Sequence, residues 1–599
     1  MPDLKQRGRE LAAQALTVIA RERDPSAAID PESLLLETPP APELGDVGIP
    51  LFPFAKILHM APTAIAVRAA GILAGDPASG TVGVFFAAGP YLNLHFNRSA
   101  AVKAVLEKIV REGETYGTLD AAGKCPLAGR RVMVEFSSPN TNKPLHLGHL
   151  RNDALGESVS RILKAAGADV HRVNIINNRG IHICKSMLAY QKFHCRPGRE
   201  DTPESLRVKS DRFVGDCYVE YDRYSKSPEG AHAEEEARAL LVAWEAGDPA
   251  VRGLWERMNT WALNGVMQTY RRTGVSFDTF YFESDTYLTG KAEIHKGLES
   301  GLFYRESDGS VQVDLAEINL EKKVLLRSDG TSLYMTQDLG LAVSRHDDWD
   351  FNELVYVVGN EQQWHFKVLF YILKKLGYAW ADRLFHLAYG MVNLPEGRMK
   401  SREGTVVDAD DLLDSLRDGA LEEIAAKGRE DAVGDPAVVA ERVALGALHY
   451  YLLQVSPLRD MLFNPRESLS FNGNTGPYLQ YMGARLASIL RKAAESGVSS
   501  AAPAEAAPLL AHDTEWELVK LLELFPAITL RAAESLDPSL LVNYLYDTAK
   551  SFGKFYHECP ILGADGPALV RSRLTLARST LTVLRSGMDM ILVPFLQSM

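Results

Sequence analysis

The chain has 599 residues, and its 65 Lys and Arg against 77 Asp and Glu give a formal net charge of −12. With 46% hydrophobic and 24% charged residues, its composition is that of an ordinary globular protein with several domains. The negative charge excludes a protein that coats nucleic acid non-specifically, because its field repels phosphates; a polyanionic partner must meet a locally basic surface.

Three features place the chain among proteins of the cytoplasm. The first residues carry charges where a secretion signal needs an apolar core. The longest uncharged stretch, 77–97, contains glycines and prolines that predict strands and turns rather than a membrane helix. Five cysteines without paired spacing are typical of reduced thiols. We therefore expect a cytoplasmic protein without membrane contact.

The first part of the chain mixes helix and strand. A polar helix is predicted over 4–22, a strand over the apolar run 81–86, and an amphipathic helix over 98–112. These elements predict an N-terminal α+β domain over residues 1–120.

Short apolar strands then alternate with helices, which predicts a parallel sheet with helical crossovers. We expect a Rossmann-like α/β domain over residues 121–430. A charged, helix-rich stretch, 200–273, is expected to be an insertion into it. The predicted strands are 131–136, 170–176, 354–358 and 385–389, and the predicted helices begin near His149 and cover 181–193 and 363–376.

The last part, 431–599, has apolar residues at helical spacing and predicts an all-α bundle. Its Ala/Pro/Ser segment, 498–508, is expected to be a flexible connection.

The segment after the first sheet strand carries the strongest chemical signal. A Pro-containing turn leads to His146-Leu-Gly-His149 at a predicted helix start, where backbone N–H groups and the positive helix end are free to meet an anion. Gly148 allows close backbone approach, so a nucleotide phosphate chain suits the site. The histidines could equally be ordinary hydrogen-bonded residues; zinc is a further alternative, although no other ligands follow at the usual spacing.

A basic loop follows the last predicted sheet strand. Arg398, Lys400 and Arg402 stand in five residues and are followed by Gly404, which suits a mobile clamp on pyrophosphate. Alone, such a run is most often a solvated loop.

Together the two segments resemble the signatures of class I aminoacyl-tRNA synthetases, with His146–His149 at the HIGH motif and Arg398–Arg402 at the KMSKS motif. The chain resembles the arginyl-tRNA synthetases over essentially its whole length. Further segments that match this family are 137–140, 327–331, 334–338, 358–362 and 475–481.

The resemblance implies a reaction in two steps, in which ATP activates arginine and the arginyl group passes to the 3′-terminal adenosine of an arginine-accepting tRNA. ATP with Mg²⁺ is implied, as is a requirement for bound tRNA during activation. Ser401 stands where most class I enzymes have a second lysine, and we hypothesise that Lys143 replaces it. The implied catalytic residues are Lys143, His146, His149, Arg398, Lys400 and Arg402, and the implied ATP-binding residues are His146, Gly148, His149, Met391, Val392 and Met399.

A guanidinium is always charged and offers five donors, so its pocket needs carboxylates and other acceptors. Tyr334 and Asp338 are four residues apart at a predicted helix start and therefore share a face. With Glu135 they are the candidates for the arginine side chain. The full set of matching arginine-binding positions is Glu135, Asn140, Tyr334, Asp338 and Gln362.

By the same resemblance, the N-terminal domain contacts the tRNA elbow and the helical domain binds the anticodon. We expect a monomer. The candidate tRNA contacts are Tyr91, Asn93, Tyr478, Tyr556 and Met599.

Two alternatives stay open. A cysteinyl-tRNA synthetase shares the helical domain but needs a zinc–thiolate pocket, and a non-catalytic tRNA-binding paralogue would not need the intact motifs. The spacing of His182, Cys184, His194 and Cys195 is unlike structural zinc sites, so we expect no structural zinc and no metal ligands. The segment 177–182 departs from the family pattern and receives no role.

Overall fold

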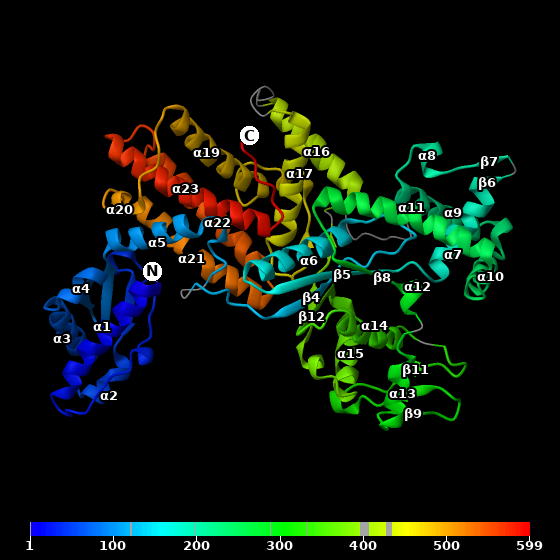
Figure 1. Cartoon of the computed structure of the whole chain (residues 1–599), viewed down its shortest axis with the longest axis horizontal. Coiled ribbons are helices and arrows are strands. Elements are labelled where there is room, and N and C mark those ends of the chain that lie inside the picture. The colour runs from blue at the N-terminus through cyan, green and yellow to red at the C-terminus, as the bar shows by residue number, and fades with distance from the viewer. Residues whose placement is uncertain are drawn as a thin grey trace. The chain divides into compact units, whose positions relative to one another are not determined.

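A computed structural model describes most of the chain (Figure 1). The described residues are 2–119, 123–196, 198–287, 289–331, 333–393, 395, 407–426 and 434–599. They form two compact units, one from 1–123, 482–527 and 547–586 and the other from 124–481, 528–546 and 587–599.

The N-terminal part of the first unit is a three-stranded antiparallel sheet, in the order β1-β3-β2, with helices packed against it. The first residue of β2, Gly83, must be a glycine, because a Cβ at this position would lie 2.0 Å from the His95 carbonyl oxygen of β3. The elements are α1 (Pro2–Arg21), β1 (Val47–Pro50), α2 (Ala55–Leu58), α3 (Pro62–Ala74), α4 (Pro77–Val82), β2 (Gly83–Ala88), β3 (Tyr91–Phe96) and α5 (Arg98–Glu112).

The predicted helices 4–22 and 98–112 are confirmed by α1 and α5. The predicted strand 81–86 begins two residues late, at Gly83, because a short helix precedes it. Pro77 at the first position of that helix and the Asp76 side chain, which accepts from the Ala78 N–H, fix its start.

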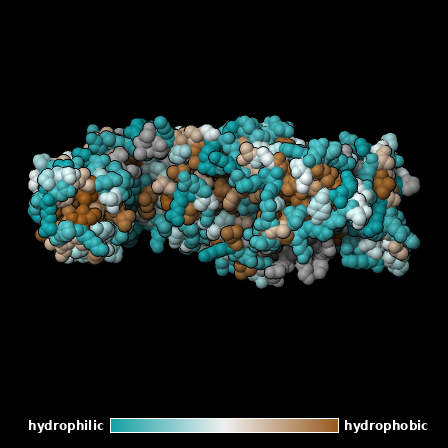
Figure 2. All heavy atoms as spheres, turned by 90° about the horizontal axis from the view of Figure 1, so that it is seen from below, coloured by the Kyte–Doolittle hydropathy of each residue, from teal (hydrophilic) through white to brown (hydrophobic). Residues whose placement is uncertain are grey.

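Hydrophobic side chains gather on the N-terminal part of the face seen in Figure 2. The large exposed apolar residues of this part include Phe52, Ile57 and Val67. In the described residues no single helix is long and apolar enough to cross a membrane; Phe52–Leu58 and Pro62–Ala74, bent by 86°, pass that test only as a pair.

The second unit is organised around a five-stranded parallel sheet in the order β13-β12-β4-β5-β8, so the predicted parallel sheet is confirmed. β4 is its first strand in the chain; β5 and β8 follow on one side, and β12 and β13 on the other. The order therefore reverses between β4 and β12. The strands are β4 (Arg131–Glu135), β5 (Asp169–Ile176), β8 (Thr279–Phe282), β12 (Glu353–Gly359) and β13 (Leu384–Tyr389).

Helices cover both faces of this sheet, as the short apolar strands require. Figure 1 shows α6 on one side and α14 and α15 on the other. Met335 and Leu339 of α14 and Leu369 of α15 join the buried core beneath the strands. The helices are α6 (Leu147–Ala165), α7 (Ile181–Ala189), α14 (Tyr334–Asp348) and α15 (Gln363–Lys375).

The stretch predicted as an insertion is helical and has an apolar core of its own, which includes Phe213, Cys217 and Trp261. The helix predicted over 181–193 ends at Ala189 and continues as a π-helical segment, Tyr190–His194. The remaining elements here are β6 (Cys195–Arg196), β7 (Arg199–Glu200), α8 (Pro203–Leu206), α9 (Ser210–Ser225), α10 (Ala233–Glu245) and α11 (Pro249–Thr273).

A second, antiparallel sheet, β11-β10-β9, lies between β8 and α14 in the chain and has no counterpart in the sequence prediction. Its strands have only three or four residues, too few to show an alternating pattern. The elements of this region are α12 (Glu283–Thr286), α13 (Lys291–Glu299), β9 (Phe303–Arg305), β10 (Val311–Val313) and β11 (Lys323–Leu326).

After the sheet the described chain is almost wholly helical, as predicted. The segment 498–508, expected to be flexible, instead contains α20, and the Ala501 N–H donates to the Arg571 carbonyl. The elements are β14 (Val392–Asn393), α16 (Ala409–Ala426), α17 (Pro436–Leu453), β15 (Met461–Leu462), α18 (Pro465–Ser468), α19 (Gly476–Glu495), α20 (Pro503–Ala506), α21 (Asp513–Ser535), α22 (Ser539–Glu558) and α23 (Pro567–Met590).

Candidate active site

The reversal of strand order between β4 and β12 marks the place where α/β sheets of this kind bind ligands, outside the carboxyl ends of the strands. Glu135, the last residue of β4, pairs in register with Tyr356 of β12. The segment that leads to His146 follows β4, and the segment that holds Gln362 follows β12. The sequence motifs therefore meet at one edge of the sheet.

The turn after β4 is held in a costly backbone conformation. Ser137 and Ser138 have φ of 78° and 52°, in the left-handed region that non-glycine residues seldom adopt. The Ser137 N–H donates to Asn152 Oδ1 (2.6 Å) and the Ser138 N–H to Asn174 Oδ1 (3.1 Å). These two buried amides fix the turn that sends the chain from β4 toward α6.

The two histidines cap the first turn of α6. The Gly148 N–H donates to His146 Nδ1 (3.1 Å), and the His146 N–H donates to His149 Nδ1 (3.2 Å). The ring centroids lie 4.0 Å apart. A Cβ at Gly148 would lie 3.0 Å from the His146 ring, so the glycine makes room first for that imidazole.

Both imidazoles are neutral at pH 7. Burial and the nearby charge of Lys143 lower the pKa of His146 to about 4. Burial, His146 and Lys143 together lower the pKa of His149 well below its usual value. Because Nδ1 accepts a backbone bond in each ring, Nε2 carries the proton and can donate to a phosphate oxygen.

Lys143, three residues before His146, is half-buried, and burial lowers the pKa of its ammonium group. Its effect on the pKa of both histidines shows that all three side chains share one neighbourhood. An anion that enters this neighbourhood therefore meets one cation and two neutral N–H donors.

The basic loop of the sequence analysis, with Arg398, Met399, Lys400 and Arg402, lies outside the described residues. The residues that follow it are described and lie beside the histidine segment. The Leu147 N–H donates to the Val407 carbonyl (3.3 Å), and the Ala409 N–H donates to the Leu145 carbonyl (3.0 Å). Between these two hydrogen bonds, Asp408 and His146 lie opposite each other as an isolated antiparallel β-bridge.

Two of the residues implied to bind ATP, Met391 and Val392, follow β13, and by the family resemblance their backbone would contact the adenine. Both backbone polar groups of Met391 already have partners, because its N–H donates to Asp460 Oδ1 (2.7 Å) and its carbonyl accepts from Met461. The Met391 side chain is half-exposed, whereas Val392 is buried in the short pairing of β14 with β15. An adenine contact by the Met391 amide would require Asp460 to release it.

The predicted arginine-binding residues include two on the first turns of α14. Tyr334 is 74% exposed and is therefore free to close on a ligand. Asp338, one turn further, accepts from His365 Nε2 of α15 at 2.6 Å. Gln362 is exposed just before α15, and Asn140, in the segment after β4, forms a bridge with Asn177.

Glu135 is more deeply buried than the exposed Tyr334. It is buried and forms an ion pair with Arg345 of α14, which is also buried. Burial raises the pKa of Glu135 against the opposing effect of Arg345, and the negative charge of Asp338 raises it further. The Arg345 guanidinium thus occupies one side of the carboxylate that the sequence assigns to arginine.

A third carboxylate belongs to this region. Burial raises the pKa of Glu283, Arg179 opposes that rise, and Asp338 adds to it. Asp338 therefore acts electrostatically on both Glu135, the last residue of β4, and Glu283, the first residue after β8. The sequence alone did not predict Glu283, His365 or Arg345 as residues of this site. Glu283 is a single acid after a short strand and has no distinctive pattern around it. Three neighbouring carboxylates, of which Asp338 is partly exposed, favour a cationic ligand here.

The candidate tRNA contacts have different surroundings. Asn93 is buried and donates to the Leu44 carbonyl (2.7 Å), which argues against a direct contact, whereas Tyr91 packs edge-on against Phe52. Tyr478 packs against Tyr546. The Arg485 guanidinium lies 4.9 Å from the Tyr556 ring centroid. Met599 packs beside the buried cluster of α16 and α17.

Comparison with known families accounts for this architecture. A model described as tRNA synthetases class I (R), catalytic domain, matches residues 121–464, which is more than half of the chain. The arginyl-tRNA synthetase family is the one to which this chain belongs. The DALR anticodon binding domain matches 479–599, and the arginyl tRNA synthetase N terminal domain matches 9–96.

Named relatives from this synthetase family cover all or nearly all of the chain. The arginine–tRNA ligase of Treponema denticola is 57% identical over 603 residues, with all of both chains covered, and that of Borrelia hermsii is 43% identical with 96% of each covered. The solved arginyl-tRNA synthetase of Thermus thermophilus has a TM-score of 0.76 and 27% identity, with 99% of this chain and 100% of that chain covered.

Proposed function

We propose that this protein is an arginine–tRNA ligase. It activates arginine with ATP to arginyl-adenylate and transfers the arginyl group to the 3′-terminal adenosine of arginine-accepting tRNA. The observation that carries the proposal is the position of the His146–His149 cap and of the acidic residues Glu135 and Asp338 at one switch point of the sheet. Phosphates and a guanidinium would be held side by side there.

Activation needs little covalent chemistry from the protein. The arginine carboxylate attacks the α-phosphate, pyrophosphate leaves, and the developing negative charge must be stabilised. The residues proposed to meet the phosphates are Lys143, His146 and His149, with Arg398, Lys400 and Arg402 of the loop. Gly148, Met391, Val392 and Met399 are proposed to complete the ATP site. Mg²⁺ is proposed to arrive with ATP and to neutralise part of its charge.

The loop has Ser401 where a second lysine is common, so a cation must come from elsewhere. Lys143 fits that role because it lies close enough to act on both imidazoles and is only half-buried. Val407–Ala409, which come after the loop in the chain, pair with Leu145–Leu147, in the segment that carries Lys143.

Arginine selectivity is proposed to come from the carboxylates. Asp338 and Tyr334 lie on one face of α14 and are accessible, so they are the first candidates for the guanidinium. Glu135 adds negative potential from the interior, while Asn140 and Gln362 are proposed to orient the amino acid. A cysteinyl enzyme would need a zinc–thiolate pocket for its substrate, and none of these five residues is a cysteine.

For tRNA we propose the N-terminal domain, 1–120, at the elbow and the helical domain, 431–599, at the anticodon, with the catalytic domain, 121–430, between them in the chain. Tyr91, Tyr478, Tyr556 and Met599 remain proposed contacts, and Asn93, two residues after Tyr91 on β3, is proposed to support them through its bond to the Leu44 carbonyl. We also propose a monomer that acts in the cytoplasm.

A charging assay tests this function. Purified tRNA from a bacterium is incubated with the protein, ATP and Mg²⁺, and each of the twenty labelled amino acids in turn. We expect arginine alone to be attached. Attachment of cysteine would favour the cysteinyl alternative, and the absence of any charging, together with tRNA binding, would favour a non-catalytic paralogue.

A further inference from the structure

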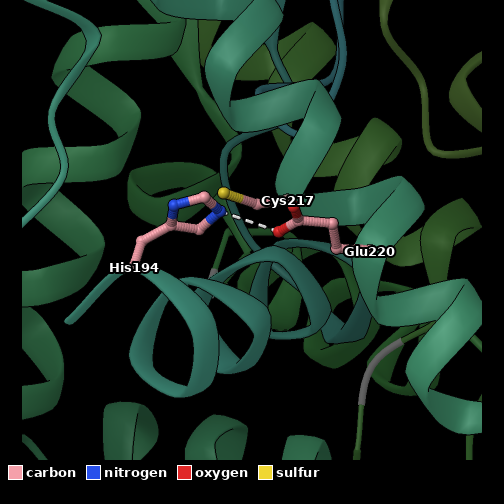
Figure 3. A group of neighbouring side chains, drawn as sticks. All are labelled: His194, Cys217 and Glu220. Atoms are coloured by element: carbon pink, nitrogen blue, oxygen red, sulfur yellow. Dashed lines mark hydrogen bonds and ion pairs between the residues drawn. The ribbon is translucent and has the colours of Figure 1, made fainter. Parts of the chain in front are cut away.

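The helical insertion contains three potential metal ligands outside the candidate active site. They are His194, Cys217 and Glu220, here called the triad (Figure 3). One ligand atom from each residue lies within 4.8 Å of the other two. The Cys217 side chain is fully buried, whereas His194 and Glu220 are partly exposed, so an ion could enter from the solvent side.

The triad is built on rigid elements. Cys217 and Glu220 are three residues apart on α9 and therefore share a face. His194 ends the π-helical segment Tyr190–His194, and its ring packs edge-on against Phe213 with centroids 5.1 Å apart. Figure 3 shows the Cys217 sulfur beside the imidazole and the Glu220 carboxylate on the same side of the ring.

A fourth residue orients the imidazole. Asp201 Oδ2 lies 3.3 Å from His194 Nδ1, while His194 Nε2 lies 2.8 Å from Glu220 Oε2. Histidines that bind metals commonly donate their second ring nitrogen to a carboxylate, which fixes the ring and its tautomer. Asp201 thus holds the far nitrogen, and Nε2 is left to face Glu220 and Cys217.

We propose that the triad binds one divalent transition-metal ion, for which zinc is the best match. A nitrogen, a sulfur and an oxygen donor form a borderline-soft set that zinc accepts, with water in the fourth position. Tetrahedral zinc places such ligand atoms about 3.5 Å apart. His194 Nε2 and Glu220 Oε2 lie 2.8 Å apart and all three ligand atoms lie within 4.8 Å of one another, so side-chain movements of about 1 Å that separate the first pair and bring the sulfur closer would suffice. The ion would link the end of the π-helical segment to α9, and so would join the two ends of the chain segment that contains β6 and β7.

The alternative is a histidine–carboxylate ion pair beside an unrelated buried thiol. That alternative explains the contact of His194 with Glu220, and it attributes the position of the Cys217 sulfur to packing in the apolar core one helical turn from Glu220. The proposed ligand set contains Cys217, whereas the sequence-based expectation of no structural zinc concerned His194 together with Cys195. Replacing Cys217 and Cys195 separately therefore tests which thiol, if either, binds the ion.

The full-length protein is stripped with a chelator under reducing conditions and then loaded with Zn²⁺ or Co²⁺. We expect one zinc per chain by mass spectrometry and, with Co²⁺, a thiolate-to-metal charge-transfer band. Cys217→Ser should lose the band, and Glu220→Gln, whose side chain is partly exposed, should bind more weakly. Asp201→Asn should lower the affinity about 10- to 100-fold.

Two matched controls separate this site from others. Cys184→Ser removes a second buried thiol of the same apolar core, and Cys195→Ser removes an exposed thiol next to His194; both should keep the zinc and the band. The proposal is overturned if wild type shows no band, if Cys217→Ser keeps it, or if Cys195→Ser loses it. Circular dichroism of each variant confirms that the insertion is folded.

Discussion

The Lys209 ammonium group lies 2.5 Å from the Asp410 carboxylate and joins the start of α9 to the start of α16. It also contacts Asp211 Oδ2 (2.9 Å) and Thr269 Oγ1 (2.6 Å). Asp410 directly follows the residues that pair with Leu145–Leu147 beside the histidines. The insertion is thus bonded to the described segment, 407–410, that comes after the signature loop in the chain.

Replacing Lys209 by Met should lower stability strongly. Arg272 still contacts Asp410, so the cost falls on Asp211, which is fully buried and would have no cation. The expected loss is on the order of 3 kcal/mol, seen as a lower melting temperature. Arg212→Met is the matched control, because its pair with Asp411 is half-exposed and worth at most about 1 kcal/mol. Equal shifts for the two variants would contradict this assignment.

The ion pair between Glu135 and Arg345 gives a second prediction. Arg345→Met alone leaves a buried carboxylate without its cation and should cost about 3–5 kcal/mol. Adding Glu135→Gln should recover much of that loss, because the uncompensated charge is removed as well. Thermal melting of the two single variants and the double variant measures the coupling, and strictly additive shifts would exclude it.

Buried histidines predict acid sensitivity. Burial lowers the pKa of His449 to about 4, and its Nδ1–H donates to the Leu592 carbonyl (2.9 Å). In the unfolded chain a histidine titrates near 6.5, so below that pH the unfolded state binds the proton first. Stability should therefore be unchanged above about pH 6.5 and fall toward pH 4, by about 2 kcal/mol at pH 5 for this residue.

His449→Asn keeps a donor at this position but does not titrate. The difference in melting temperature between wild type and variant should be largest at pH 7 and should shrink at pH 5. A constant difference over that range would show that His449 does not contribute to the acid sensitivity. His146 and His149 add to the fall with the same sign, because burial lowers their pKa values too.

Lys143→Ala tests the source of the missing cation. Loss of one charged contact to the reacting phosphate should lower kcat for adenylate formation by about 10- to 100-fold. The KM for arginine should change little, and Lys143→Arg should recover part of the rate. ATP–pyrophosphate exchange in the presence of tRNA measures both, and a rate within a few-fold of wild type for Lys143→Ala would refute the role.

Local patterns predicted the elements that carry the site. The strand ending at Glu135, the turn and the helix that begins at His146–Leu147 are adjacent in the chain, so residue spacing alone placed them together. The parallel sheet followed from the alternation of strands and helices. The very short strands β9 to β11 gave no signal because three or four residues cannot display a period.

Partners distant in the chain were beyond the reach of such patterns. Arg345 lies 210 residues after Glu135, and an arginine is ordinarily expected at the surface, so nothing in the sequence marked it as buried. His365 is 27 residues from Asp338, and only the packing of α14 against α15 brings them together. The burial of Asn93 was also beyond such patterns, because a polar strand residue can face the interior when a backbone carbonyl accepts its hydrogen bond.

The most direct test of an arginine site beside the histidine cap is the KM for arginine of Asp338→Asn in tRNA-dependent ATP–pyrophosphate exchange. We predict a rise of about tenfold or more with an unchanged KM for ATP, which corresponds to the loss of one charged hydrogen bond. His365→Gln, which keeps the carboxylate, should have a smaller effect. An unchanged arginine KM in Asp338→Asn would contradict the account.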